Sequence, residues 1–544
     1  MKVYPILLSI VLLALSACVQ GEAVCDVKLA PVLALKPCNE AATIEMKVEK
    51  SEKVKAVVLE LEATGSLKDL KSCSLEIDGS QFAVKPLDLQ SGEARVSIPL
   101  ELQVDTTATI TLGLMTKDEV DLDNIIEIKK VGVKTSHGTI PAEITGSPRL
   151  RLGVALRQRG QDGCDNCRIP GLVTTTKGSL IAIYDARYER NSDLQGDIDI
   201  CYNRSTDGGK TWSPMSKILD MGEWGGLPEK YNGVSDPSIT VDALTGDLYV
   251  AGTWMYGILD PKTGRFVEGL TKDSKEWNHQ WREHGSQPGY GVKQSSQMII
   301  AKSTDDGLTW SDPVNITRQV KPEKWWLMTT SPGAGITLSD GTIVIPAQGR
   351  DETGMAISTL ISSKDRGRSW SAGNRITEAV PCNECMCVEL PDGSIMLNCR
   401  STVNRGLKEG NGRIIGTTTD LGKTWTEHPT SRKALIEPTC MASILRHDYL
   451  RADGQKVPTL FFFNPNDIKE RIHHTLKCSV DNGETWPEDL WLELDACKGA
   501  GYSCMAMLDN ETLGVVYEGS GACLVFQRVK LVTDENGRVK GYVR

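Results

Sequence analysis

The chain has 544 residues, which is too long for one small hydrophobic core and indicates several domains or one large repeat fold. Its composition, 40% hydrophobic and 24% charged, excludes a disordered or collagen-like chain. The formal net charge of −10 argues against a nucleic-acid partner, and it requires any anionic ligand to be held by a local cluster of arginines. The 51 glycines and 12 tryptophans are typical of turn-rich all-β folds.

The N-terminus has the pattern of an export signal. Lys2 precedes an apolar run from Ile6 to Leu15, which is too short to span a bilayer, so we expect a signal peptide over residues 1–17. Cys18 directly follows Leu-Ser-Ala and resembles the lipidated cysteine of bacterial lipoproteins; an ordinary signal peptide is the alternative. We therefore expect an exported protein of a bacterium, periplasmic or at the cell surface, attached to a membrane only through this anchor.

The 16 cysteines include two groups at spacings also found in metal sites. These are Cys164 with Cys167, and Cys382 with Cys385 and Cys387. No second regular Cys-x-x-Cys and no His-x-x-x-His completes a zinc set. We therefore expect buried thiols or local disulfides and no metal.

Residues 22–148 differ from the rest, since they contain no tryptophan and alternate apolar and polar side chains in short runs. Examples are Val57, Leu59 and Leu61, and further along Val96, Ile98 and Leu100. This period of two predicts an antiparallel β-sandwich, whose function is carbohydrate binding or simple spacing.

From residue 150 to residue 544 the chain is repetitive. The octamer S-x-D-x-G-x-T-W, with Thr or Ser variants, begins at Ser205, Ser303, Ser363, Thr418 and Ser479. Its Asp accepts backbone hydrogen bonds and its Gly permits positive φ, so each copy predicts a hairpin turn, and the Trp is expected to pack on the blade. After a longer first interval, which places an insertion near residues 255–290, the copies recur roughly every sixty residues, as in a four-stranded propeller blade.

Apolar strands that start after Gly or Asp-Gly precede each box, and a sixth start at Asp509 has no box after it. Six starts and five boxes predict an all-β, six-bladed β-propeller preceded by the small β-sandwich, with the last blade closed by another part of the chain. Five equivalent carboxylates would face five directions, so we interpret the boxes as structural.

Together with Arg168-Ile169-Pro170, the boxes resemble the bacterial exo-α-sialidase (neuraminidase) family over about residues 150–544. That family binds the sialic acid carboxylate with three arginines, which match Arg168, Arg400 and Arg471 here. A planar guanidinium fits a carboxylate bidentately and stays charged at any working pH. The resemblance also places Arg187 and Asp236 at the outer hydroxyls and N-acetyl side of the sugar, and it makes Glu518 the carboxylate that orients the first clamp arginine.

The resemblance further implies a retaining reaction with a tyrosine nucleophile. The reacting carbon of a sialoside already bears a carboxylate, so an anionic Asp or Glu nucleophile would be repelled. Tyr502 matches the family's nucleophile, and Glu384 matches the base that takes its proton. Asp193 matches the general acid/base. Asp197 and Asp199 are rivals for that role, but alternation places them on the following strand.

The expected function is release of terminal sialic acids from sialylated glycans, glycoproteins or glycolipids, by chemistry that requires no metal or organic cofactor. Two alternatives remain open: a trans-sialidase or anhydro-forming enzyme, which would share these residues, and a non-catalytic sialic-acid-binding propeller. Retention of Asp193, Glu384 and Tyr502 argues against the binding module, because a lectin needs only the arginines.

Overall fold

The structure, a computed structural model, describes residues 21–77, 79–194, 196–224, 228–256, 286–292 and 295–543. The expected signal peptide, Cys18 and most of the insertion near residues 255–290 lie outside these residues. Within the described part of the chain, no helix has the length and apolar character needed to cross a membrane.

The chain divides into two compact units. The first comprises residues up to Lys28, Glu40–Leu114 and Ile126–Pro148. The second comprises Leu29–Asn39, Met115–Ile125 and Arg149–Arg544. Two short segments from the N-terminal half of the chain therefore belong to the second unit.

The first unit is built of β-strands in the order β7-β4-β9-β10-β1-β3-β8-β5-β6, and β6 contacts β7 as well, so the sheet curls around its core. Val57, Leu59 and Leu61 of β4 are buried, as the alternation predicts. The elements are β1 (Gly21–Val27), β3 (Asn39–Val48), β4 (Glu52–Ala63), the 3-10 turn η1 (Leu67–Asp69), β5 (Leu70–Ile77), β6 (Ser80–Pro86), β7 (Glu93–Val104), β8 (Thr107–Thr116), β9 (Ile125–Thr135) and β10 (Thr139–Gly146).

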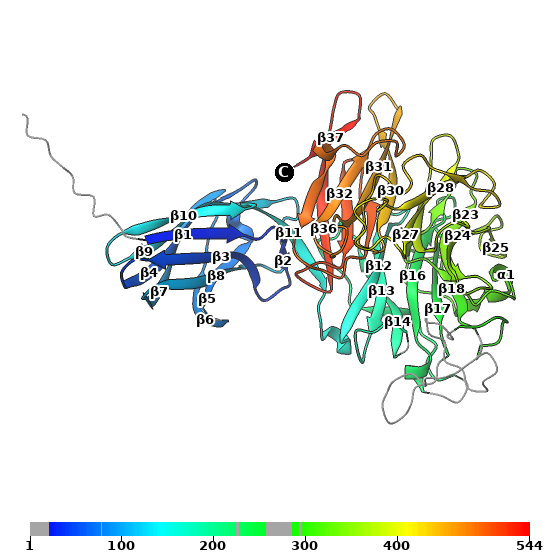
Figure 1. Ribbon diagram of the computed structural model, residues 1–544, viewed down its shortest axis with the longest axis horizontal. Coiled ribbons are helices and arrows are strands. Elements are labelled where there is room, and N and C mark those ends of the chain that lie inside the picture. Colours follow the sequence, from blue (N-terminus) through cyan, green and yellow to red (C-terminus); the bar gives the residue numbers. More distant parts are fainter. Residues whose placement is uncertain are drawn as a thin grey trace, which may run out of the picture. The chain divides into compact units, whose positions relative to one another are not determined.

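The second unit is a succession of small sheets, which follow the chain from cyan to orange in Figure 1. Among the described residues, five of these sheets are separate. Their strands are β12 (Asn166–Thr174), β13 (Leu180–Arg187), β14 (Ile198–Ser205) and β15 (Ser216–Leu219); β16 (Val234–Val241), β17 (Leu248–Trp254), β18 (Gln297–Ser303), β19 (Val314–Asn315) and β21 (Gly333–Ala334); β20 (Leu327–Thr330), β22 (Ile336–Thr337), β23 (Ile343–Arg350), β24 (Ala356–Ser363) and β25 (Ser371–Ala372); β26 (Cys382–Glu389), β27 (Ile395–Ser401), β28 (Ile414–Thr418) and β29 (Thr426–Glu427); β30 (Ser443–Leu450), β31 (Lys456–Pro465), β32 (His474–Ser479) and β33 (Leu492–Asp495).

The last strands of the unit do not form a separate sheet. Strands β34 (Ser503–Met507), β35 (Thr512–Tyr517) and β36 (Leu524–Thr533) pair in order, and β36 pairs with β11 (Arg149–Arg157) from the start of the unit. Strand β11 also pairs with β2 (Val32–Ala34), and β36 with β37 (Val539–Tyr542). Among the described residues the structure thus has five separate blade-like sheets where the sequence predicted six, because β36 pairs with β11 from the start of the unit and these last strands do not form a sheet of their own.

The sheets form a propeller-like ring, as the sequence predicted. Strands of neighbouring sheets contact one another in the order β12, β16, β23, β26, β30 and β34, and β34 contacts β12. Among the described residues of the second unit, helical structure is limited to α1 (Thr317–Val320) and the 3-10 turns η2 (Gln161–Gly163), η3 (Glu229–Tyr231) and η4 (Glu488–Leu490).

The repeated octamers are hairpin turns, as predicted. Asp305 accepts hydrogen bonds from the Thr309 amide at 2.9 Å and hydroxyl at 2.5 Å and from the Ser303 hydroxyl at 2.8 Å, and these bonds lower its pKa to about 2. Three of the tryptophans do more than pack on their own blade. Trp212, Trp310 and Trp370 make edge-on contacts with Phe526, Tyr202 and Tyr249 of the preceding sheet, at centroid distances of 5.2, 6.0 and 6.2 Å. These three boxes therefore join adjacent sheets, whereas Trp486 contacts Phe462 of its own sheet.

Candidate active site

Three strands of the ring carry a break in register at a residue that the sequence singled out. The breaks lie between Arg168 and Gly171 in β12, between Ser235 and Ser238 in β16, and between Cys382 and Cys385 in β26. Ile169 and Asp236 have positive φ of 62° and 58° within them. A bulge bends a strand and re-aims a side chain, so these irregularities turn Arg168, Asp236 and Glu384 out of the regular alternation.

Tyr502, Glu384 and Arg400 form one hydrogen-bonded group. The Tyr502 hydroxyl donates to Glu384 Oε1, while Arg400 Nη1 donates to the Tyr502 oxygen at 2.8 Å and to Glu384 Oε2 at 2.5 Å. Burial and the charge of Glu384 raise the pKa of Tyr502 well above its usual range, so the phenol is protonated at neutral pH. Its proton therefore points at a carboxylate and its lone pair at a guanidinium.

The other two predicted clamp arginines converge on the same ring. The guanidinium carbons of Arg168 and Arg471 lie 5.4 and 5.5 Å from the Tyr502 ring centroid. Arg471 donates from Nη1 to the Ala500 carbonyl at 2.6 Å and from Nη2 to the Thr439 carbonyl at 3.4 Å. Three cations thus surround one phenol, an arrangement suited to an anionic ligand.

Glu518 connects Arg168 to the backbone at Tyr502. Its carboxylate accepts from Arg168 Nε at 2.7 Å and Nη2 at 3.0 Å, and from the backbone amides of Ile169 at 2.8 Å and Tyr502 at 3.0 Å. Burial alone would raise the pKa of Glu518, but the charge and hydrogen bond of Arg168, together with the bonds from the two backbone amides, outweigh burial and lower that pKa. The predicted orienting contact with Arg168 is present, and Glu518 also fixes the backbone at Tyr502.

Arg187 and Asp193 are bonded to each other. Arg187 is 1% exposed; it donates from Nε and Nη2 to Asp185 at 3.2 and 2.9 Å and from Nη1 to Asp193 at 3.0 Å. The Asp193 side chain is 69% exposed in the loop after β13. Buried Arg187 therefore holds the carboxylate of Asp193, which is exposed to solvent.

Asp236 lies beside this pair. Its amide donates to Asp185 Oδ1 at 3.1 Å, and its Oδ2 accepts from Gln348 Nε2 at 3.3 Å. Burial, and then the charges of Asp185, Glu384 and Asp193, raise the pKa of Asp236 well above its usual range. Its carboxyl is therefore favoured in the protonated form, in which it can donate a hydrogen bond.

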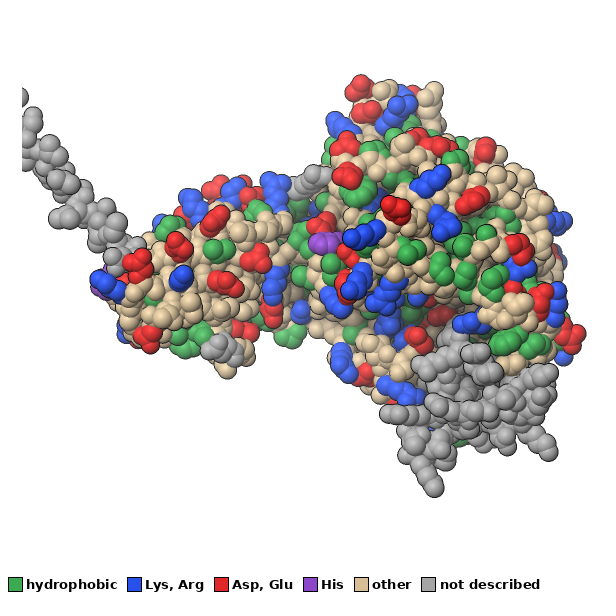
Figure 2. Space-filling model, viewed as in Figure 1, with side chains coloured by type: hydrophobic (Ala, Val, Ile, Leu, Met, Phe, Trp, Pro, Cys, Tyr) green, Lys and Arg blue, Asp and Glu red, His purple; other side chains and the backbone are tan. Residues whose placement is uncertain are grey.

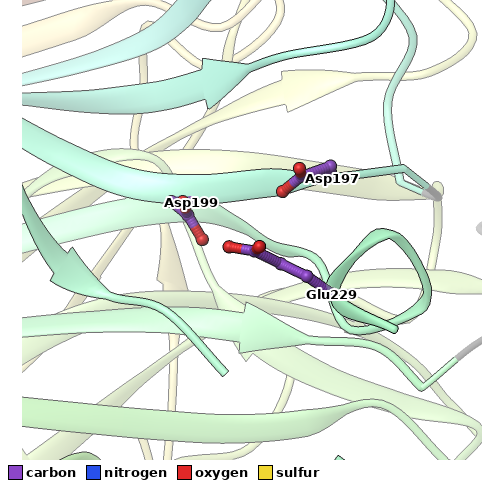
Figure 3. A group of neighbouring side chains, drawn as sticks. All are labelled: Asp197, Asp199 and Glu229. Carbon is purple, nitrogen blue, oxygen red and sulfur yellow. The ribbon is translucent and has the colours of Figure 1, made fainter. Parts of the chain in front are cut away.

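Asp197 and Asp199, the rivals of Asp193, belong to a different group. Their carboxylates and that of Glu229 point toward one another from the start of β14 and from η3 (Figure 3). Lys217 Nζ lies 2.7 Å from Asp199 and 3.1 Å from Glu229. Although burial raises the pKa of Asp197 to about 6 and of Asp199 to about 7, the ammonium of Lys217 already supplies a positive charge among the carboxylates.

The cysteines in the described part of the chain are thiols, and most of them are buried. Cys385 Sγ donates to the Ala347 carbonyl at 3.5 Å, and Cys382, Cys385, Cys387 and Cys399 pack in one apolar cluster. Cys440 is 1% exposed, and its Sγ donates at 3.9 Å to the Ala500 carbonyl that also accepts from Arg471. These side chains fill the interior of the blades.

The sequence analysis missed three supporting residues. Asp185 is fully buried between Arg187, Ser235 and Asp236, and its place two residues before Arg187 in a strand could have indicated a shared face. Glu437, fully buried and paired with Arg413 at 2.5 Å, accepts from the amide of Ser401 next to Arg400 at 2.7 Å. Gln348 and Glu437 stand far from their partners in sequence, so no local pattern marks them.

The chain is similar to known proteins in sequence and in structure. The family model described as a BNR repeat-like domain matches residues 169–518. A sialidase of Bacteroides fragilis is 43% identical over 385 residues, covering 70% of this chain and 65% of the relative. A sialidase of Micromonospora viridifaciens is 30% identical over 407 residues, covering 71% of this chain and 56% of the relative. The chain thus spans less than two thirds of the length of either relative.

A solved structure of a Hadza microbial sialidase is 31% identical, with a TM-score of 0.79, and the match covers 93% of this chain and 99% of that one. The BNR repeat is the Asp-box turn found here five times. The chain belongs to the BNR repeat-like domain family, and the proteins that it resembles in this comparison are sialidases.

Proposed function

We propose that the protein is a retaining exo-α-sialidase that releases terminal sialic acid from glycans through a covalent tyrosyl intermediate. One observation carries this proposal: the Tyr502 hydroxyl donates to Glu384 while it accepts from Arg400 at 2.8 Å. A tyrosine held only for packing does not need a base on one side of its oxygen and a cation on the other. The sialidases among its relatives support the same conclusion.

Substrate binding begins at the arginines. Arg168, Arg400 and Arg471 would bind the carboxylate of the sugar and place the anomeric carbon next to Tyr502 Oη. Their charges are partly compensated by Glu518 and Glu384, so the clamp is preorganised before substrate arrives. Asp236 and Arg187 would lie at the outer part of the ring, where a protonated Asp236 can donate to a hydroxyl or carbonyl oxygen.

In the first step, Tyr502 Oη bonds to the anomeric carbon as the glycosidic bond breaks. The phenolic proton passes to Glu384, to which it is already hydrogen-bonded, and Asp193 donates a proton to the departing oxygen. Arg400 stabilises the negative charge that develops on the phenolic oxygen. A neutral nucleophile avoids the repulsion that a carboxylate would meet beside the substrate's own carboxylate.

In the second step, water attacks the anomeric carbon and gives its proton to Asp193, while Tyr502 leaves and recovers its proton from Glu384. Two inversions give overall retention. The exposure of Asp193 suits this role, because the same carboxyl must meet both a leaving alcohol and an incoming water. Arg187 holds it in place at 3.0 Å.

The proposal extends to the rest of the chain. Strands β34, β35, β36 and β11 would serve as the sixth blade, since β34 contacts both β30 and β12. The substrates would be sialylated glycans outside the cell, reached by a lipoprotein exported through the signal peptide and held at Cys18.

The test is sialic acid release from a fluorogenic sialoside by the wild type, Tyr502→Phe and Asp193→Ala. We expect release by the wild type with the α-anomer appearing first by NMR, and losses of at least about a hundredfold in both variants. Absence of release by the wild type would overturn the proposal that the protein is a sialidase. An anhydro or transferred product, identified by mass, would overturn the proposal that the reaction is hydrolysis. Full activity of Tyr502→Phe would overturn the assignment of Tyr502 as the nucleophile.

A further inference from the structure

A pocket of about 170 Å³ adjoins the arginine clamp and shares two of its side chains. Arg400 and Arg471 form part of its wall, and the remaining wall comes from loops that the proposed chemistry does not use. Its lining residues are Arg400, Arg405, Pro438, Thr439, Lys469, Glu470, Arg471, Lys498 and Gly499. The pocket therefore adjoins the clamp, and Tyr502 is not among the residues that line it.

The lining is strongly cationic. Among the residues that the structure describes, Glu470 is the one acidic side chain in it, against three arginines and two lysines. The face seen in Figure 2 carries side chains of both signs, and the whole chain carries a net charge of −10. A cluster of positively charged side chains in a protein of negative net charge indicates an anionic ligand.

Glu470 offsets only part of this charge. It pairs with Lys498 Nζ at 3.0 Å. The hydrogen bond from Lys498, followed by the nearby charges of Lys469 and Arg405, lowers the pKa of Glu470. Arg405 and Lys469, both exposed, therefore direct their charge at the same space.

The loops that carry these cations are fixed by their backbones. Asp467 accepts from the amides of Lys469 at 2.7 Å and Glu470 at 2.6 Å. The amide of Gly406 donates to the Ile468 carbonyl at 2.6 Å, and the amide of Gly499 to the Arg471 carbonyl at 3.1 Å. Three separate segments are thus tied together, which brings Arg405, Lys469 and Lys498 to one place without a ligand.

Thr439 adds a polar group at the wall. Its φ is 56°, a strained value for a β-branched residue, and its carbonyl accepts from Arg471 at 3.4 Å. Its buried hydroxyl finds no hydrogen-bond partner among the described residues. The strained backbone and the unsatisfied hydroxyl both distinguish this residue, which lines the pocket together with Arg471.

We propose that this pocket is a second anion subsite, which receives a carboxylate or sulfate group that the glycan carries in addition to the carboxylate held by the clamp. The inference rests on the proposed function and specifies its substrate class: glycans with two anionic groups near the non-reducing end. Arg405 and Lys469 are its specificity residues, and they touch neither Tyr502 nor Glu384.

The experiment compares kcat/KM for three substrates: a sialoside with a neutral underlying sugar, a disialyl glycan and a sulfated sialoside. The enzymes are the wild type, the double variant Arg405→Gln with Lys469→Gln, and a charge-matched control, Lys364→Gln with Lys540→Gln, in an Asp-box turn and in β37. A charge-retaining variant, Arg405→Lys with Lys469→Arg, tests whether charge alone suffices.

We expect the wild type to prefer a dianionic substrate, and the Gln double variant to lose about tenfold on that substrate with less than about a twofold change on the neutral one. The control and the charge-retaining variant should keep the preference for the dianionic substrate over the neutral one. This preference should become smaller at high salt, because salt screens the charges. Whichever dianionic substrate responds identifies the group as carboxylate or sulfate. Equal ratios in wild type and double variant overturn the subsite, whereas no cleavage of any substrate overturns the proposed function instead.

Discussion

Replacement of Glu518 by glutamine tests how the clamp is held. The change removes the negative charge opposite Arg168 while keeping the side chain's shape. Loss of one partner of a buried ion pair costs about 3–5 kcal/mol, and because glutamine keeps one acceptor oxygen we expect about 3 kcal/mol. The backbone amides of Ile169 and Tyr502 lose part of their acceptor as well, so the nucleophile and the first arginine both shift.

The assay is guanidinium chloride unfolding followed by tryptophan fluorescence, which reports only the second unit because residues 22–148 contain no tryptophan. The exposed Glu535→Gln is the control and should change the free energy of unfolding by less than about 0.5 kcal/mol. Adding Arg168→Met to Glu518→Gln should cost less than the sum of the single changes, since the uncompensated charge is gone. A loss below about 1 kcal/mol for Glu518→Gln, or strict additivity, would refute the reasoning.

Three further predictions concern single residues. Burial lowers the pKa of Lys477 to about 7, so the unfolded chain binds the extra proton between pH 7 and its usual 10.5 and stability rises across that window. Lys477→Met should remove a rise of at most about 5 kcal/mol in unfolding free energy, and an unchanged pH profile would contradict this. Asp481→Ala should cost about 2 kcal/mol in urea unfolding, because the bonds from Ser479 and Thr485 are lost, with kcat and KM unchanged. Arg471→Ala should lower kcat/KM by about a hundredfold or more. An unchanged kcat/KM would contradict the role of Arg471 in binding the substrate carboxylate.

Much of the fold could be predicted from local sequence. Each Asp-box turn can be predicted from eight residues, since the Asp accepts its hydrogen bonds from side chains and amides of the same octamer. The period of two likewise predicted β4. Local sequence could not predict whether the last strands form a sheet of their own, because that depends on the pairing of β36 with β11, which lies far away in the sequence. Nor did the sequence indicate that three of the box tryptophans reach the preceding sheet.

The candidate site likewise contains residues that a local sequence motif predicts and residues that only the folded structure reveals. Arg168, Glu384 and Tyr502 stand in motifs of their own, and the structure brings their side chains together around one phenol. The residues that support them do so through tertiary contacts: Gln348 reaches Asp236 from another sheet, and Glu437 holds the backbone beside Arg400. Such partners carry no local signature, because burial and pairing are properties of the folded ring.

The most direct test of the central claim is to trap the intermediate. A sialoside with fluorine beside the anomeric carbon and a good leaving group should complete the first step and stall before the second, because the electronegative fluorine disfavours the oxocarbenium-like transition state. Digestion and mass spectrometry should place the adduct on the peptide that contains Tyr502, with none in Tyr502→Phe. An adduct on Glu384 or Asp193, or an unmodified enzyme that still turns the substrate over, would contradict the tyrosyl mechanism.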